Sequence, residues 1–192
     1  MSNPTSKRPN GRSTRVKTTV FDAVETLLAE KEGEFPTMAE VAELAGVNAT
    51  SLYRRWGDVR KLLAEVAVER LMRDHPIPDQ GSARDDVMVW ATSVAEAIGN
   101  PDGLSLLRVM ASDVQSAKHD VDMAKLPIGR RIAELDAMLE RGKKRGERVP
   151  SVQDLLEIVL APLYLHALFL GPIKKPAGVA RLVDRAFGLA RD

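Results

Sequence analysis

Apolar residues recur every three or four positions along most of this chain, and no stretch of useful length alternates apolar with polar residues. The first spacing places apolar side chains on one face of an α-helix, whereas alternation would indicate a β-strand. The pattern therefore predicts an all-α protein. Helices are predicted over residues 14–31, 37–45, 48–56 and 58–73, then after Ser82, Asn100 and Pro127, and finally over 151–170 and 177–190.

Local signals mark where several of these helices begin and end. Thr37 is followed three residues later by Glu40, which is the pattern of a capping box. Asn48 and Asp58 are suitable N-cap residues for the next two helices. The segment HPIPDQG, residues 75–81, contains two prolines that prevent a helix from continuing. This segment is the predicted boundary between one domain over 14–74 and another over 81–192.

Composition narrows the class of protein. Aromatic residues make up only 4% of the chain, which favours packed helices over sheets. The chain has no cysteine, which excludes disulfides and thiolate metal sites. The first twenty residues lack the apolar segment of a signal peptide. The longest apolar run, 158–170, is interrupted by Pro162 and is expected to be too short to cross a bilayer, which takes ~20 residues. The expected location is therefore the cytoplasm, without membrane contact.

Charge is unevenly distributed along the chain. The net charge of +1 gives no overall attraction to nucleic acid. Before Asp22, however, there are five basic residues and no acid. Residues 1–13 are therefore predicted to form a flexible basic arm, which is either a solvated tail or an additional contact to DNA phosphates.

The stretch AELAGVNATSLYRRW, residues 42–56, combines a glycine turn with an unusual polar helix. Two short helices joined at Gly46 form a helix-turn-helix, whose second helix fits the major groove of DNA. This helix has hydroxyl groups near its start, arginines near its end and no acid. Arg60 and Lys61 follow in the first turn of the next helix, where the helix dipole disfavours cations, so a nearby anion would explain them. The pattern indicates DNA binding.

A family resemblance agrees with this interpretation. The stretch TMAEVAELAGVNATSLYRRWGDVRKLLAEV resembles the helix-turn-helix of the TetR (tetracycline-repressor) family of bacterial transcriptional regulators. The resemblance covers about residues 14–74, and the remainder is similar only in its helical architecture. It implies a three-helix DNA-binding domain followed by a C-terminal helical bundle for ligand binding and dimerisation. The residues that carry it are Thr37, Val41, Ala42, Ala45, Gly46, Val47, Leu52, Tyr53, Trp56 and Leu62.

The resemblance also implies which residues contact DNA. Ala49, Thr50, Arg54 and Arg55 correspond to positions that face bases or the neighbouring backbone, and Tyr53 to a phosphate contact. Val59 departs from the family pattern, because many members have a lysine there; Arg60 or Lys61 is expected to replace it. The predicted DNA-binding residues are Thr37, Ala49, Thr50, Ser51, Tyr53, Arg54, Arg55, Arg60 and Lys61.

Members of the family bind palindromic DNA as dimers, so a dimer surface is expected. The helix over 155–170 is apolar nearly all round and must be buried on more than one side. It is either the centre of the monomer core or it contacts a partner chain together with the last helix, as the family's four-helix dimer bundle implies. The candidate interface residues are Leu156, Val159, Leu163, Leu182, Val183 and Ala186.

The segment from Ser82 to about Arg145 is expected to hold a small-molecule effector. The candidate lining residues are Trp90, Met110, Met123, Met138 and Phe169, each of which could equally be an ordinary core residue. His119 and His166 are isolated, so no metal site is predicted. No cofactor is expected.

Together these features predict a ligand-responsive regulator rather than an enzyme. The chain contains no P-loop, dinucleotide fingerprint or G-x-S-x-G elbow. The hypothesis is a homodimeric repressor that places residues 50–55 of each subunit in successive major grooves of an operator. A ligand would shift the helix after Asp58 through Leu62, Leu63 and Val66. The alternative is a helical small-molecule-binding or scaffolding protein that uses residues 49–56 for protein contacts.

Overall fold

The computed structural model describes residues 10–31, 34–100, 103–105, 107–109 and 126–190. All regular elements in these ranges are helices, which confirms the all-α prediction. Two compact units divide the chain, Met1–Val66 and Ala67–Asp192. The division falls inside a helix, α4, which runs without interruption from Val59 to Asp74.

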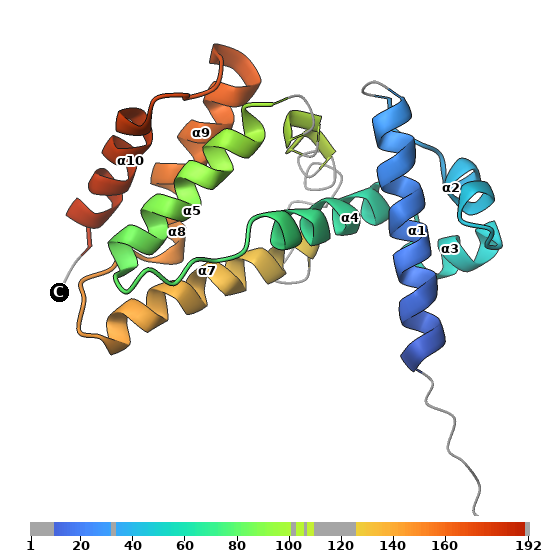
Figure 1. Ribbon diagram of the computed structural model, residues 1–192, viewed down its shortest axis with the longest axis horizontal. Coiled ribbons are helices and arrows are strands. Elements are labelled where there is room, and N and C mark those ends of the chain that lie inside the picture. The colour runs from blue at the N-terminus through green and yellow to red at the C-terminus, as the bar shows by residue number, and fades with distance from the viewer. Residues whose placement is uncertain (1–9, 32–33, 101–102, 106, 110–125, 191–192) are drawn as a thin grey trace, which may run out of the picture. The chain divides into compact units, whose positions relative to one another are not determined.

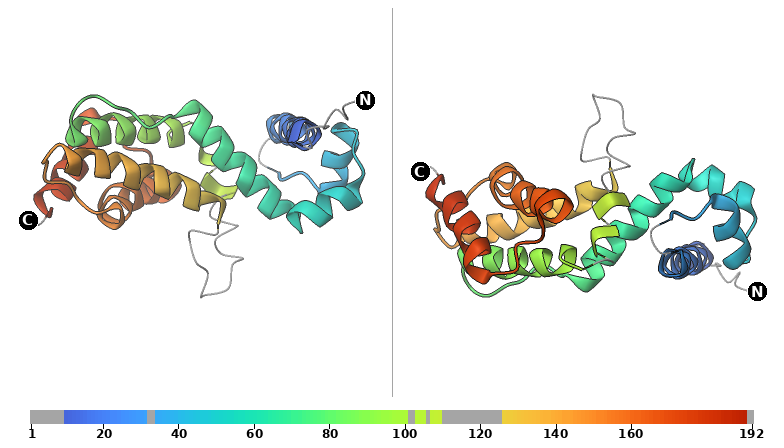
Figure 2. Two further views of the ribbon diagram at one scale, coloured as in Figure 1. Left: turned by 90° about the horizontal axis from the view of Figure 1, so that it is seen from below. Right: turned by 90° about the horizontal axis from the view of Figure 1, so that it is seen from above.

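The N-terminal unit contains α1 (Asn10–Glu30), α2 (Met38–Leu44), α3 (Ala49–Trp56) and the first half of α4. Helix α2 packs against both α1 and α3, and Figure 2 shows α1 nearly end-on with the two short helices beside it. Helix α1 starts four residues before the predicted Thr14, because Asn10–Ser13 carry no apolar side chain that would have revealed it. The core of this unit comprises Val20, Phe21, Val24, Met38, Val41, Leu52, Trp56, Leu62 and Leu63.

The predicted caps fix the turns of this unit. Thr37 and Glu40 form the capping box, with the Glu40 carboxylate accepting from the Thr37 amide at 2.7 Å. The Asn48 side chain accepts from the Thr50 amide at 2.8 Å, and Asp58 from the Lys61 amide at 3.2 Å. Gly46 lies at φ 63°, a left-handed conformation that few other residues tolerate. These signals are local, which is why the sequence alone located them.

The C-terminal unit is built around α5 (Ala83–Ile98), which packs against α7 (Pro127–Lys144) and α10 (Pro176–Gly188) (Figure 1). A continuous helical stretch, 152–170, supplies the remaining core helix. It consists of α8 (Val152–Asp154), η2 (Leu155–Leu160), α9 (Ala161–Leu165) and η3 (His166–Leu170), of which η2 and η3 are π-helical. The largest buried side chains of the unit are those of Trp90, Leu135, Met138, Leu139, Leu155 and Leu163.

The stretch 152–170 is longer than the apolar run suggested. It has 19 residues and a window of mean hydropathy 1.4, so by length and composition it could cross a membrane, the one such helix among the described residues. The apolar run over 158–170 is the second part of this helix, which begins at Val152, close to the predicted start at 151. Core helices pass the same test, and Leu155, Val159 and Leu163 of this one are buried. Several other apolar residues of this helix, such as Leu156 and Leu168, are partly buried against the same core.

The close approach of α7 to α5 requires a glycine. A Cβ atom added to Gly142 would lie 2.6 Å from the Cβ of Ala83 and 2.9 Å from Cγ1 of Val149. We expect Gly142→Ala to lower the free energy of unfolding by about 1–3 kcal/mol, because an overpacked core must shift its backbone. Urea unfolding followed by circular dichroism measures this loss.

Gly188→Ala is the matched control for this substitution. Gly188 is the last residue of α10, and nothing lies within 4 Å of an added Cβ. This variant is expected to be as stable as the original or more stable by up to about 1 kcal/mol, since alanine favours helix. Equal stabilities for the two variants would contradict the close contact at Gly142.

Candidate nucleic-acid interface and ligand cavity

Helix α3 has one buried and one exposed face. Leu52 and Trp56, four residues apart, are 1% and 7% exposed and fix the helix to the N-terminal unit. Tyr53, directly after Leu52, is 53% exposed. Because residues four apart share one helix face, burial of this pair leaves the remaining positions turned toward solvent. The hydroxyl groups and arginines of α3 are therefore presented outward.

The predicted DNA-binding residues lie at accessible positions of this unit. The Thr37 hydroxyl already bonds Glu40 at 2.8 Å, so a phosphate would have to compete with that carboxylate. Ala49 is partly buried at the start of α3. Val59 is also partly buried, whereas the two cations after it are exposed. The exposed members of the predicted set are Thr37, Thr50, Ser51, Tyr53, Arg54, Arg55, Arg60 and Lys61.

The charge pattern around α3 favours an anionic partner. Helix α3 contains no acid and ends with Arg54 and Arg55. Glu40 of α2 is compensated by Lys31, the residue directly after α1, whose ammonium lies 2.6 Å from the carboxylate. This hydrogen bond, together with those from Thr37, lowers the pKa of Glu40 to about 2. The carboxylate thus remains ionised and paired, and it does not oppose an approaching phosphate as a lone negative charge would.

A three-helix polar contact holds the end of α3, and the sequence did not reveal it. Nε1 of Trp56 donates to Oε2 of Glu65 in α4 at 2.7 Å, and Nζ of Lys17 in α1 lies 2.9 Å from the other carboxylate oxygen. The Trp56 ring also lies 6.4 Å from that of Phe21 and 4.8 Å beneath the Arg55 guanidinium. A buried indole N–H generally finds a partner, which was the one available signal for Glu65. We call Lys17, Trp56 and Glu65 the Glu65 contact.

The predicted dimer residues divide into two groups. Val159, Leu163, Val183 and Ala186 are buried in the core of their own chain, so they are not available to a partner, whereas Leu156 and Leu182 are partly exposed. This corrects the expected interface, because a helix that is apolar all round does not reveal which side faces inward. The exposed apolar side chains of the stretch 152–170 are instead Leu165, Phe169 and Leu170, at 53%, 76% and 67% exposure.

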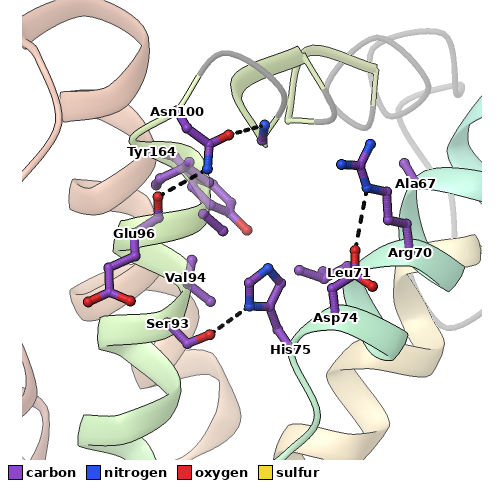
Figure 3. Close-up of a pocket in the computed structure, with 13 residues that line it drawn as sticks. Ala67, Arg70, Leu71, Asp74, His75, Ser93, Val94, Glu96, Asn100 and Tyr164 are labelled. Atoms are coloured by element: carbon purple, nitrogen blue, oxygen red, sulfur yellow. Dashed lines mark hydrogen bonds and ion pairs between the residues drawn. The ribbon is translucent and has the colours of Figure 1, made fainter. Parts of the chain in front are cut away.

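A cavity of about 440 Å³ lies within the C-terminal unit, and its volume is in the usual range for ligand sites. The lining residues from α4 and its end are Ala67, Arg70, Leu71, Asp74 and His75; those from α5 are Ser93, Val94, Glu96, Ala97 and Ile98; and Asn100, Gly103 and Tyr164 complete it (Figure 3).

None of the three described pocket candidates lines this cavity. Trp90 and Met138 are fully inside the core, at 2% and 0% exposure, and Phe169 lies on the surface. The methionines at 110 and 123 lie outside the described residues. The sequence approach selected large apolar side chains, whereas the cavity is formed largely by small and polar ones.

Comparisons with known proteins show which family this chain resembles. Residues 77–186, more than half of the chain, match the family described as "Tetracyclin repressor-like, C-terminal domain". The HTH-type transcriptional regulator AqdR of Rhodococcus erythropolis is 34% identical over 154 residues, which cover 80% of this chain and 73% of AqdR. The chain belongs to the TetR family.

More distant relatives extend the similarity over nearly the whole chain. The HTH-type transcriptional regulator YdeS of Bacillus subtilis is 22% identical over 95% of this chain and 93% of its own length. The solved structure of the TetR family transcription regulator SCO0332 matches with a TM-score of 0.73 at 22% identity, covering 93% of this chain and all of the other. A TetR regulator from Rhodococcus sp. RHA1 gives 0.65 at 19% identity, covering 91% and 97%. The structural matches show the shared fold.

Family membership decides between the two functions that the sequence left open. The protein is a DNA-binding transcriptional regulator with an N-terminal helix-turn-helix, and its relatives are regulators, not enzymes.

A basic run in this TetR-family chain lies outside the helix-turn-helix. Residues 141–144 belong to the end of α7, and 145–150 form the turn that follows it. Arg141 donates to the Pro78 carbonyl at 2.6 Å, while Lys143 pairs with Glu140 and Arg145 with Glu147. Arg141, Lys143 and Arg145 thus make contacts within the C-terminal unit.

The Glu65 contact predicts energetic coupling between α3 and α4. We expect Trp56→Phe and Glu65→Gln each to lower the free energy of unfolding, and the double variant to lose less than the sum of the two. The coupling should be about 1–2 kcal/mol, as for a hydrogen bond to a charged group. Urea unfolding of the four proteins in a double-mutant cycle measures it.

Trp90→Phe combined with Glu65→Gln provides the control cycle. Trp90 is also buried, but its Nε1 atom has no hydrogen-bond partner among the described residues. The losses from these two substitutions should therefore add. If Trp56→Phe and Glu65→Gln were additive as well, the Glu65 contact would contribute nothing to holding α3.

Proposed function

We propose that the protein is a ligand-responsive repressor that binds a palindromic operator as a homodimer. One observation carries the proposal: in a TetR-family chain, α3 is fixed by two buried side chains while its acid-free face of hydroxyls and arginines is exposed. An α-helix of this kind fits the major groove, where base edges are read by hydrogen bonds.

We assign different roles to the residues on this face. Ala49, Thr50, Arg54 and Arg55 face bases or the adjacent backbone, and Tyr53 bonds a phosphate. Thr37 and Ser51 serve as further phosphate anchors. Many family members have a lysine at the position of Val59, and we assign its phosphate contact to Arg60 or Lys61. Val59 is partly buried, whereas these two cations directly after it are exposed, which supports the assignment.

For the dimer we propose a surface centred on Leu165 and Phe169. These residues are four apart, so they lie on one helix face, and Ala161 continues the same exposed stripe one turn earlier. A contiguous exposed apolar surface is typical of a protein interface. Leu156 and Leu182, which are partly exposed, remain candidates for its edge. The dimer would place two copies of α3 about one helical turn of DNA apart, on the order of 34–36 Å.

Helix α4 is the element through which we expect a ligand to act. Its first half contributes Leu62, Leu63 and Val66 to buried positions, and its second half lines the cavity. A ligand in the cavity would shift α4 and alter the spacing of the two α3 helices, provided that it binds one spacing better than the other. The protein would act in the bacterial cytoplasm, where its operator lies.

Tyr53→Phe and Arg55→Ala test the DNA contacts. We expect each to weaken binding to the region upstream of the protein's own gene, by about tenfold, since a lost contact costs ~1–3 kcal/mol. An electrophoretic mobility shift at two salt concentrations measures the effect. The loss for Arg55→Ala should be smaller at high salt, because phosphate contacts release counterions.

Arg148→Ala is the control for this experiment, because Arg148 is an exposed arginine in the turn after α7. Its affinity for the same DNA should be unchanged. If all three variants bound as tightly as the original protein, α3 would not be the DNA-binding helix.

Phe169→Glu tests the dimer surface. A charged side chain at a 76% exposed position should leave the monomer folded but should oppose association, because an unpaired charge would be buried in the interface. Sedimentation equilibrium should show the mass falling toward the 21.0 kDa of one chain. Val89→Glu, at a 46% exposed apolar position of α5, should remain associated. A dimer that survives Phe169→Glu would place the interface elsewhere.

A further inference from the structure

Part of the wall of the cavity between α4 and α5 is apolar. Ala67 and Val94 are almost fully buried, and Leu71 and Ala97 are partly buried. Together with Ile98 and the Tyr164 ring, they form the surface against which the body of a ligand would lie. Such walls favour a molecule that is apolar over most of its surface.

Most polar groups around the cavity already have partners inside the protein. Nε of Arg70 lies 3.4 Å from the Asp74 carboxylate, which also accepts from Arg73 at 2.9 Å. The Asn100 side chain accepts from the Gly103 amide at 2.8 Å. In Figure 3 the Glu96 carboxylate points away from the cavity. The charges at the rim are therefore compensated or directed elsewhere.

Two polar atoms face the cavity without a described partner. The Tyr164 hydroxyl is directed into it from α9, and His75 presents one ring nitrogen to it, as Figure 3 shows. The other nitrogen of His75 lies 2.6 Å from the Ser93 hydroxyl. Burial raises the pKa of Tyr164 to about 12, so its hydroxyl keeps the proton and can donate it in a hydrogen bond.

The His75 group is held in place before any ligand arrives. Nη2 of Arg131, which is only 3% exposed, donates to the His75 carbonyl at 2.7 Å. The backbone is thus tied to α7, and the ring is tied to α5 through Ser93. A polar group that is fixed on both sides gives up little freedom on binding, which improves affinity and selectivity.

We propose that this cavity binds an uncharged, largely apolar molecule with a carbonyl or hydroxyl oxygen, which accepts a hydrogen bond from Tyr164 and lies beside His75. The proposal rests on the proposed function, because it names the chemical class of the effector. Anionic ligands such as carboxylates or phosphate esters are disfavoured, since Arg70 is already paired with Asp74. Buried charge without a compensating partner is costly.

Three probes with the same ring system test the class of ligand. They are 2-naphthol, 2-methylnaphthalene and 2-naphthoate, which carry a hydroxyl, a methyl and a carboxylate at one position. Equilibrium dialysis against the full-length, DNA-free protein at neutral pH gives the three dissociation constants. We expect 2-naphthol to bind about 2- to 12-fold more tightly than 2-methylnaphthalene, the range for one hydrogen bond. The carboxylate should bind at least about tenfold more weakly than 2-naphthol.

Tyr164→Phe then identifies the group that selects the hydroxyl. The ratio of the 2-methylnaphthalene and 2-naphthol dissociation constants should fall to about one, while 2-methylnaphthalene itself binds as before. A purely structural role for Tyr164 would weaken both probes alike. Val89→Ala is the control, because Val89 is an exposed residue of α5 that does not line the cavity, and it should leave all three constants unchanged.

The results separate this proposal from the proposed function. Three outcomes would overturn the proposal, even if the protein still binds DNA. They are tightest binding of 2-naphthoate, a preference for the hydroxyl probe that remains in Tyr164→Phe, and no binding of any probe. Selective probe binding by a protein that shifts no DNA would uphold the cavity and contradict the repressor. If Tyr164→Phe does not fold, the order of the three probes on the unaltered protein still decides the ligand class.

Discussion

Burial of Leu52 and Trp56 is the constraint on which DNA binding depends. Helix α3 has only eight residues, which is too short to be stable alone in water, so its existence and its direction come from the surface that it covers. Because Leu52 and Trp56 are buried, the hydroxyls and arginines of α3 face the solvent. The Glu65 contact then limits rotation at the far end, where Arg55 lies over the Trp56 ring. Burial of one side of α3 thus determines which side chains its other side exposes.

The sequence predicted the features that depend on neighbouring residues. Capping at Thr37, Asn48 and Asp58 involves residues two or three positions apart, and each was found as expected. The fold class and the family followed from helical spacing and from one contiguous motif. The Glu65 contact joins three helices and depends on packing distances, and so no spacing along the chain could reveal it.

The cavity of the C-terminal unit shows the limit of the same approach. Large apolar residues such as Trp90 and Met138 fill the core, so they leave no cavity beside them. The cavity forms where Ala67, Ala97 and Gly103 leave room beside partnered polar groups. Small residues are common in any helical protein. Ala67, Ala97 and Gly103 differ from the others only because they lie close together in the folded structure. For a related reason the sequence did not predict which side of the stretch 152–170 faces the core, because apolar residues occur on all of its sides.

The π-helical turns of that stretch connect its length to the face that it exposes. A π turn closes a hydrogen bond one residue further along than an α turn, so it takes in an additional residue. Each residue of an α-helix rotates the chain by about 100°. The wider turn takes in the additional residue within about the same rotation, so removing one residue from Leu155–Leu160 would restore a regular helix and leave Leu165 and Phe169 on the same side. Two regulators that differ by one residue at this turn would then still present the same surface to a partner.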